Sequence, residues 1–238
     1  MICRSSRRFK LEAPFAELVA LYNLNILVAL NLAPRWNIAP SQDVPVVVKD
    51  EPQNRLVMKR WGLIPYWAKD AKVGYSMLNA RADALTAKPA WREPFKRGRC
   101  LVVADGFYEW QRAGKAKLPW LYTVDGGKPF AFAGLWDNWK SPEGTVLSTC
   151  AIVTTEANAL AAEVHDRMPV ILDPAEAATW LDPKTAEADL LALTKPFPPE
   201  RMAAVRVNPA MNNANNEGAE YAAPLTGDEE PEAAPTLF

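Results

Sequence analysis

The sequence is poor in the side chains on which many catalytic and metal centres depend. Its 238 residues include three cysteines, Cys3, Cys100 and Cys150, and a single histidine. An odd number of cysteines without a CxxC pair predicts a reducing compartment and argues against a disulfide framework or a zinc site. One histidine excludes a multi-histidine metal centre. We therefore expect neither a metal ion nor another cofactor.

Long apolar runs are missing as well. The longest candidate, 24–34, is interrupted by Asn25 and Asn31 and is shorter than the roughly 18–20 residues that a membrane-spanning helix requires. The first residues, MICRSSRRF, are basic, but no apolar run or small-residue cleavage site follows them, so they do not fit a secretory signal. The sequence also has no glycine-rich phosphate loop and no internal repeat. These absences predict a soluble, cytoplasmic protein without a membrane partner.

The sequence does contain the balance of an ordinary globular domain, with 49% hydrophobic and 23% charged residues. A chain of this length is expected to form one domain around one core. The net charge of −1 conceals an asymmetry, because residues 1–120 carry 20 Lys and Arg against 10 Asp and Glu, whereas residues 121–238 carry 7 against 18. Either the basic half faces a polyanionic partner, or the two halves interleave in one mixed surface.

Hydrophobic and turn patterns predict an α+β fold, a single domain with a mostly antiparallel β-sheet or barrel core and peripheral helices. The predicted helices are 14–24, 158–164, 175–181 and 185–193, and a helix-permissive stretch at 84–97 is broken by prolines. The predicted strands are 44–48, 56–60, 100–111, 120–124, 129–136, 146–155 and 202–207. Residues 1–222 form the predicted domain, and 223–238 form an acidic, disordered tail.

Two side chains are candidates for proton transfer. Glu109 lies in DGFYEW, where loss of hydration among aromatic residues disfavours the carboxylate and would keep an acid protonated near neutral pH. A strand with one solvent-facing polar side also permits a glutamate there. His165 lies between a predicted helix and a predicted strand, flanked by Asp166 and Arg167. Functional loops occur at such places, although a lone histidine is more often structural.

Other residues are suited to single-stranded nucleic acid. Asn79 and Arg81, in LNARAD, form a polar pair that could orient a substrate and hold a phosphate. Nine tryptophans are many for this length, and for any single one the core is the expected place. However, the segment from Trp61 to Trp67, WGLIPYW, places two indoles and a tyrosine around a glycine and a proline, close to basic residues. Loop aromatics of this kind stack on unpaired bases, for about 1–3 kcal/mol per base.

Taken in order, these segments resemble the SRAP family (SOS response-associated peptidase), whose members are abasic site processing proteins. The matching segments are a basic start with Cys3 and Arg8-Phe9, WNIAP at 36–40, RWGLIP at 60–65, LNARAD at 78–83, RCL at 99–101, ADGFYEW at 104–110, VTT at 153–155, HDRMP at 165–169, and Val207-Asn208 followed by 212–218. They span residues 1–222, and their shared order is far more specific than any one motif.

The resemblance implies a β-rich α+β fold, single-stranded DNA binding and covalent capture of the ring-opened sugar of an abasic site in the DNA damage and SOS responses. It also implies peptidase (autoproteolytic) and lyase-type activity. An N-terminal cysteine of the family offers an α-amine and a thiol, so that the imine formed with the aldehyde closes to a thiazolidine. The implied partner is single-stranded DNA with abasic sites, bound by a monomer associated with the nucleoid.

The resemblance also assigns roles to residues of this chain. Cys3 would be the nucleophile and Glu109 the general acid and base. His165 would assist formation and reversal of the imine, and Asn79 would orient the N-terminal residue. The implied DNA contacts are Arg8, Asn37, Pro40, Trp67, Arg81 and Arg167.

The start of the chain departs from the family pattern, in which cysteine directly follows the initiator methionine. Here Ile2 separates Met1 from Cys3, and alignment on Arg8-Phe9 places Ser6 where the cysteine belongs. An internal Cys3 has an amide nitrogen in place of the α-amine and cannot form a thiazolidine. Three explanations are open at this point: cleavage exposes Cys3, the native start differs, or the covalent step has been lost.

Three other functions are compatible with these residues. A non-catalytic single-stranded DNA-binding protein on this fold needs only Arg81, the tryptophans and the basic half. A cysteine peptidase or amidase needs a reactive thiol near the histidine, but Cys100 and Cys150 lie in predicted apolar strands, where a buried, unreactive thiol is expected. A purely structural β-barrel module leaves the settings of Glu109 and His165 unexplained.

Overall fold

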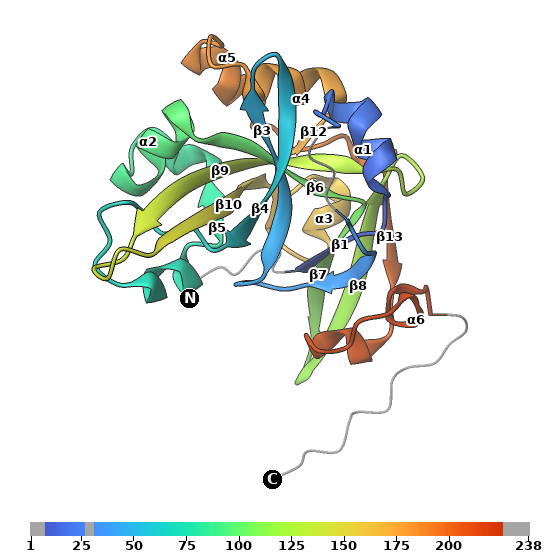
Figure 1. Ribbon diagram of the computed structural model, residues 1–238. Coiled ribbons are helices and arrows are strands. Elements are labelled where there is room, and N and C mark those ends of the chain that lie inside the picture. Colours follow the sequence, from blue (N-terminus) through green and yellow to red (C-terminus); the bar gives the residue numbers. More distant parts are fainter. Residues whose placement is uncertain (1–7, 27–30, 226–238) are drawn as a thin grey trace.

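Two β-sheets make up the body of the molecule (Figure 1), which the computed structural model describes for residues 8–26 and 31–225. The first sheet has the order β13-β8-β7-β1-β2. Its strands are β1 (Arg8–Leu11), β2 (Arg35–Ile38), β7 (Gly106–Ala113), β8 (Ala116–Val124) and β13 (Met202–Arg206). The second sheet contains β3 (Asp43–Asp50), β4 (Gln53–Trp61), β5 (Asn79–Arg81), β6 (Arg99–Ala104), β9 (Phe130–Lys140), β10 (Val146–Glu156), β11 (Arg167–Pro169) and β12 (Ile171–Leu172).

Five strands of the second sheet close into a barrel. β3 lies between β4 and β6, β6 pairs with β9, and β10 pairs with both β9 and β4. The barrel pairings are antiparallel except for β4–β10, which is parallel. Strands β5 and β11 extend the sheet beside β10, and β12 lies beside β9. The predicted α+β fold with a largely antiparallel barrel core is confirmed.

The helices lie around these sheets (Figure 1). They are α1 (Phe15–Tyr22), α2 (Pro89–Arg97), α3 (Ala159–Ala162), α4 (Pro174–Leu181), α5 (Glu187–Ala192) and α6 (Ala219–Ala222). Short 3₁₀ turns are η1 (Ala71–Ser76), η2 (Ala82–Ala84), η3 (Pro199–Arg201) and η4 (Pro209–Asn212). Within the described residues, none of the helices has the length and apolarity needed to cross a membrane.

The inner face of the five-stranded sheet packs against the barrel through aromatic rings. The ring centroid of Phe9 on β1 lies 5.3 Å from that of Trp61 and 5.9 Å from that of Phe132. On β7, Phe107 points to the same side and lies 6.0 Å from Phe132. The outer face carries Tyr108, which packs in a smaller cluster under the C-terminal part of the chain. Because alternate residues of a strand share a face, β7 directs every second side chain toward the barrel.

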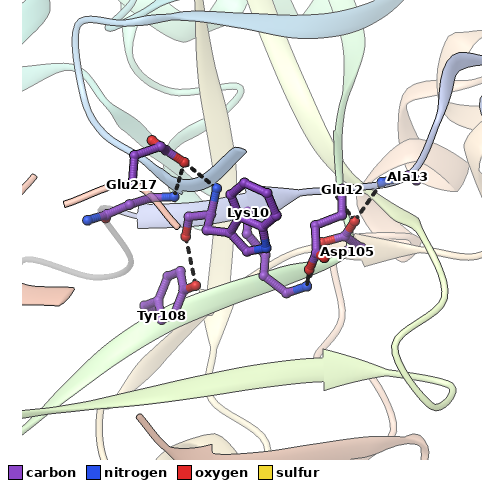
Figure 2. A network of polar contacts seen from close by, with 8 residues as sticks. Lys10, Glu12, Ala13, Asp105, Tyr108 and Glu217 are labelled. Carbon is purple, nitrogen blue, oxygen red and sulfur yellow. Dashed lines mark hydrogen bonds and ion pairs between the residues drawn. The ribbon is translucent and has the colours of Figure 1, made fainter. Parts of the chain in front are cut away.

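The predicted strand 100–111 is wrong in one respect, because the chain changes sheets within it. β6 ends in the barrel and β7 begins in the other sheet, with Asp105 between them. The backbone N–H of Asp105 donates to the Lys10 carbonyl at 3.0 Å. The Asp105 carboxylate accepts from the backbone N–H of Ala13 at 3.0 Å (Figure 2). Lys10 Nζ lies 3.1 Å from the same carboxylate. A Cβ on Gly106 would lie 2.8 Å from Leu121 Cδ1, so any larger residue at this turn would have to displace the Leu121 side chain.

Most other predicted elements are confirmed. The hairpin predicted from 44–48 and 56–60 is β3–β4, and the strands predicted at 120–124, 129–136, 146–155 and 202–207 are β8, β9, β10 and β13. The predicted helices correspond to α1, α3, α4 and α5, with α3 shorter than predicted. Of the predicted tail, residues 226–238 lie outside the described residues.

Candidate functional site

Strand β5 places Asn79 and Arg81 beside the barrel strand β10. The two strands are parallel, with Asn79 opposite Ile152 and Arg81 opposite Thr154. Ala80, between them, is fully buried. Asn79 and Arg81 therefore share the opposite face of this short strand. A three-residue strand thus presents an amide and a guanidinium from one edge of the barrel.

The turn between α3 and β11 holds His165. Its backbone N–H donates to the Ala161 carbonyl at 2.9 Å, which anchors the turn to the end of α3. His165 Nδ1 lies 3.1 Å from the backbone nitrogen of Arg167 and 3.0 Å from a carboxylate oxygen of Asp166. A neutral imidazole accepts from the Arg167 N–H, whereas an imidazolium can donate to Asp166. The ring therefore has a local partner in either protonation state.

Two arginines flank Thr154 on β10. Arg167 lies on β11, and its Nη2 donates to the Thr154 carbonyl at 2.6 Å. Arg81, opposite Thr154 on the other strand, makes two contacts with the Asp83 carboxylate, at 3.0 Å and 2.5 Å. The hydrogen bond from Arg81 lowers the pKa of Asp83, and the charge of Arg167 contributes. A cavity of about 360 Å³ opens here, lined in part by Asp83, Arg167 and Glu156.

Glu109 approaches from the other sheet. It lies on β7 opposite Trp120, two residues after Phe107, and is 2% exposed. Because Phe107 packs against the barrel, Glu109 faces the same side. A glutamate in this position is buried at the junction of the two sheets, which matches the low-polarity setting expected from its sequence.

Tyr122 lies on the same inner face as Phe107 and Glu109. The Tyr122 ring stacks on Phe107, with centroids 5.0 Å apart, and is fully buried. Burial raises the pKa of Tyr122, and the carboxylates of Glu109 and Glu163 raise it further. Glu163 is two residues before His165, so charges on β7 and near the α3–β11 turn both act on this hydroxyl.

Arg8 is the first described residue and pairs with Tyr108, the neighbour of Glu109. The N-terminal segment therefore joins the sheet one register position from Glu109. The guanidinium of Arg8 donates to Asn37 Oδ1 at 2.7 Å and lies 5.8 Å from the Trp110 ring centroid. These contacts fix the start of β1. Cys3, the predicted nucleophile, lies outside the described residues.

Asn37 is fully buried and holds a C-terminal loop, residues 208–218, against β2. Its Nδ2 donates to the carbonyls of Asn213 at 3.0 Å and Asn216 at 2.9 Å. In return, the Glu217 carboxylate accepts from the backbone N–H of Asn37 at 3.0 Å and from that of Trp36 (Figure 2). We expected Asn37 to contact DNA directly, but its position means that any contribution to binding acts through the C-terminal loop.

Replacing Asn37 with alanine should destabilise the fold by about 2–3 kcal/mol, because several buried carbonyl groups and Arg8 lose a hydrogen-bonding partner together. For a domain of this size, this corresponds to a fall in Tm of about 4–12 °C. Thermal unfolding followed by circular dichroism measures the shift. Asn138→Ala, which removes an exposed amide from β9, is the matched control and should leave Tm within about 2 °C. An unchanged Tm for Asn37→Ala would show that the loop is held by other contacts.

The two remaining predicted DNA contacts are at the surface. Trp67 is 54% exposed on the loop after β4. Pro40 is partly exposed and precedes Ser41, a non-glycine residue with φ of 68°. Trp67 and Pro40 are therefore accessible, in contrast to Asn37.

Cys100 and Cys150 are fully buried in β6 and β10. Burial raises the pKa of Cys150 to about 12 and the pKa of Cys100 well above its ordinary value. A thiol that cannot ionise near neutral pH is a poor nucleophile. Neither cysteine is suited to peptidase chemistry.

Comparison with known proteins identifies the family of this chain. A family model described as SOS response associated peptidase (SRAP) matches residues 6–214. The chain belongs to the SRAP family. It is 42% identical over 216 residues to the abasic site processing protein YoqW of Bacillus subtilis, covering 90% of this chain and 96% of that protein. It is 29% identical over 242 residues to the mouse abasic site processing protein HMCES, covering 84% of this chain and 68% of that protein.

The fold of this SRAP chain also matches solved structures. A crystal structure of a protein from Bacteroides thetaiotaomicron superposes with a TM-score of 0.82 at 27% sequence identity, covering 92% of this chain and 99% of that chain. A protein from Bordetella bronchiseptica superposes with a TM-score of 0.71 at 22% identity, covering 85% of this chain and 99% of that chain. This second likeness concerns the fold alone.

Several residues around the site were not identified from the sequence. Thr154 is fully buried between Arg81 and Arg167, Asp83 pairs with Arg81, and Tyr122 lies near Glu109. The spacing of Arg81 and Asp83 was a usable signal, since opposite charges two residues apart at the end of a strand can form a local ion pair. Thr154 and Tyr122 carry no comparable signal, because their neighbours come from distant parts of the sequence.

Proposed function

We propose that this SRAP protein binds single-stranded DNA and captures abasic sites covalently. The observation that carries the proposal is the cluster around β10: Asn79, Arg81 and Arg167 lie on strands paired with β10, and the turn with His165 leads into one of them. Glu109 is buried on the face of the other sheet that packs against the barrel, and we propose that it acts at the same site. The relatives named abasic site processing proteins make abasic DNA the natural substrate class.

The proposed roles follow from the settings of these side chains. Arg81 and Arg167 bind phosphates, because guanidinium groups pair with phosphate oxygens. Glu109, buried between the sheets, transfers protons as the sugar ring opens and the imine forms. His165 assists the same imine step and its reversal, and Asn79 orients the attacking N-terminal residue. A lyase-type or autoproteolytic step would use the same proton-transfer groups.

Incubation with a single-stranded oligonucleotide that contains one abasic site tests the proposal. A heat-stable protein–DNA adduct, seen on a denaturing gel and by intact mass, is the expected result. A salt-sensitive complex without an adduct would indicate a non-catalytic DNA-binding protein instead. Absence of any binding would contradict both functions.

Arg81→Ala should weaken binding to all single-stranded sequences alike. It removes about one phosphate contact, so the slope of log K against log salt should become shallower by about 0.7. Fluorescence anisotropy over a salt series measures both quantities. Arg112→Ala, on the β7–β8 hairpin, is a control with equal loss of charge. A loss confined to particular sequences would show that Arg81 reads bases.

His165→Ala should slow both formation and reversal of the adduct, because the imidazole no longer assists the imine step. Time courses of capture, and of release after transfer to a competitor oligonucleotide, measure the two rates. Undamaged DNA should bind with unchanged affinity. If the variant captures and releases abasic DNA at wild-type rates, the single histidine has only a structural role.

A further inference from the structure

An acidic residue lies among the arginines that the proposed function assigns to phosphate. Asp83 is two residues after Arg81, in the η2 turn that follows β5. Together with Arg167, it lines the cavity of about 360 Å³ beside β10. A negative charge on a phosphate-binding surface should weaken the binding of DNA by repulsion. The proposed function gives Asp83 no role.

The contact between Asp83 and Arg81 is bidentate. Arg81 Nε donates to Asp83 Oδ1 at 3.0 Å, and Arg81 Nη2 donates to Asp83 Oδ2 at 2.5 Å. Two parallel N–H···O bonds of this kind fix the plane of a guanidinium as well as its position. They use two of the five N–H donors that an arginine carries. The ion pair can therefore orient Arg81 without using its whole capacity to bind an anion.

The backbone holds both partners of this ion pair in fixed places. Arg81 is opposite Thr154 in the parallel pairing of β5 with β10. Asp83 is followed by Ala84 and Leu85, and both of these residues are buried. The side chains of Arg81 and Asp83 are nevertheless 55% and 60% exposed. The guanidinium of Arg81 is thus oriented at the surface, where a phosphate can reach it.

Arg167 brings a second positive charge to the same place. Its Nη2 donates to the Thr154 carbonyl at 2.6 Å, so the side chains of Arg167 and Arg81 flank one residue of β10. Two like charges repel each other, and a carboxylate between them offsets that repulsion. The hydrogen bond from Arg81, and then the charges of Arg81 and Arg167, lower the pKa of Asp83. The carboxylate is therefore ionised at neutral pH, as this arrangement requires.

We propose that Asp83 is a positioning residue, which holds the Arg81 guanidinium beside Arg167 so that the two arginines bind the DNA backbone as a preorganised pair. Preorganised groups lose less conformational entropy when they bind. Removal of this acidic residue should therefore weaken DNA binding, although it makes the protein more positive. This inference rests on the proposed function, because it takes single-stranded DNA as the ligand and Arg81 as a phosphate contact.

The effect of Asp83→Asn on DNA affinity distinguishes positioning from repulsion. Asparagine keeps the size of the side chain but replaces one carboxylate oxygen with an NH₂ group, which cannot accept from Arg81. Affinity for an undamaged single strand should fall about three- to tenfold, and the slope of log K against log salt should become shallower by about 0.7, as for the loss of one phosphate contact. Fluorescence anisotropy over a salt series measures both quantities.

If Asp83 only repels phosphate, or competes with it for Arg81, the results have the opposite sign. Asp83→Asn would then bind single-stranded DNA more tightly than wild type, and the salt slope would stay the same or become steeper. Either of these results overturns the inference.

Glu156→Gln is the matched control for the loss of negative charge. Glu156 lines the same cavity and is exposed. The Arg167 side chain is directed to Thr154, so we do not expect Glu156 to position it. The control variant should bind single-stranded DNA as tightly as wild type or more tightly. Equal weakening in Glu156→Gln and Asp83→Asn would overturn the inference, because the loss of either acid would then act in the same general way.

A double-mutant cycle tests whether Asp83 acts through Arg81. In the Arg81→Ala background, Asp83→Asn should leave the affinity unchanged or raise it, because only a repulsive charge is then removed. A loss of equal size in both backgrounds would show that Asp83 does not act through Arg81, and the inference would be wrong. An exposed ion pair adds little to stability, so all four proteins should unfold within about 2 °C of one another.

Failure of this inference and failure of the proposed function give different results. If the protein forms no adduct, but Asp83→Asn weakens binding through Arg81, covalent capture fails and the positioning role stands. If the protein captures abasic DNA and Asp83→Asn binds more tightly, the positioning role fails and the proposed function stands. Failure to bind single-stranded DNA at all overturns both.

Discussion

Replacing Glu109 with glutamine should slow formation of the adduct with abasic single-stranded DNA by about 10²–10⁴-fold, which is the usual contribution of a general acid or base. Glutamine keeps the size and polarity of the side chain but cannot donate or accept a proton at the reacting sugar. Glu109 is 2% exposed and faces the junction of the two sheets, so bulk water cannot easily replace it. Single-turnover capture kinetics measure the effect.

The affinity of Glu109→Gln for undamaged single strands should stay within about twofold of wild type, because its carboxylate is not a phosphate contact. Glu163→Gln is the matched control, since Glu163 is an exposed carboxylate near the same Tyr122 hydroxyl. It should capture abasic DNA at nearly the wild-type rate. Equal capture rates for wild type and Glu109→Gln would remove Glu109 from the chemistry.

Much of the fold could be predicted because its strongest signals are local. The β3–β4 hairpin reads as two β-branched segments around a polar turn, and α1 follows a proline at its start. The short strands β1, β2 and β5 were missed, since segments of three or four residues are too short for a periodic pattern. The change of sheet at Asp105 was also missed, because the apolar pattern continues through it while the partners that turn the chain, Lys10 and Ala13, lie about ninety residues away.

The candidate site shows the same division between features with a local sequence signal and features that depend on distant segments. Asn79, Glu109 and His165 stand out in the sequence by their unusual neighbours and by the order of the family motifs. Their supporting contacts depend on pairings between distant segments, such as Thr154 on β10 between β5 and β11. Asn37 shows the limit of assigning a role by resemblance, because a motif identifies the residue but not which way its side chain points. Its amide contacts the C-terminal loop, more than 170 residues away in the sequence.

The identity of the N-terminal residue should decide almost completely whether a heat-stable adduct forms. Durable capture requires an amine and a thiol on the same residue, because the imine formed by the amine hydrolyses unless the thiol closes it to a ring. Cys3 meets this requirement only when it is the first residue. We therefore expect protein that retains Met1 and Ile2 to bind abasic single strands and to form little heat-stable adduct. The α-amine of Met1, with an ordinary pKa of about 8, can form an imine but has no adjacent thiol.

Protein cleaved so that Cys3 is the first residue should form the durable adduct, and so should protein with its start replaced by Met-Cys-Gly-Arg-Phe, Phe9 being kept in frame. Arg8 is fixed by Asn37, in register with the neighbour of Glu109, so both starts are attached to the same fixed residue. The Cys3→Ser variant of the cleaved protein is the control, because a serine imine closes to a much less stable ring. Intact mass after incubation with the oligonucleotide identifies the N-terminus of each species. Equal amounts of heat-stable adduct on chains that still carry Met1 and Ile2 would show that another group is the nucleophile.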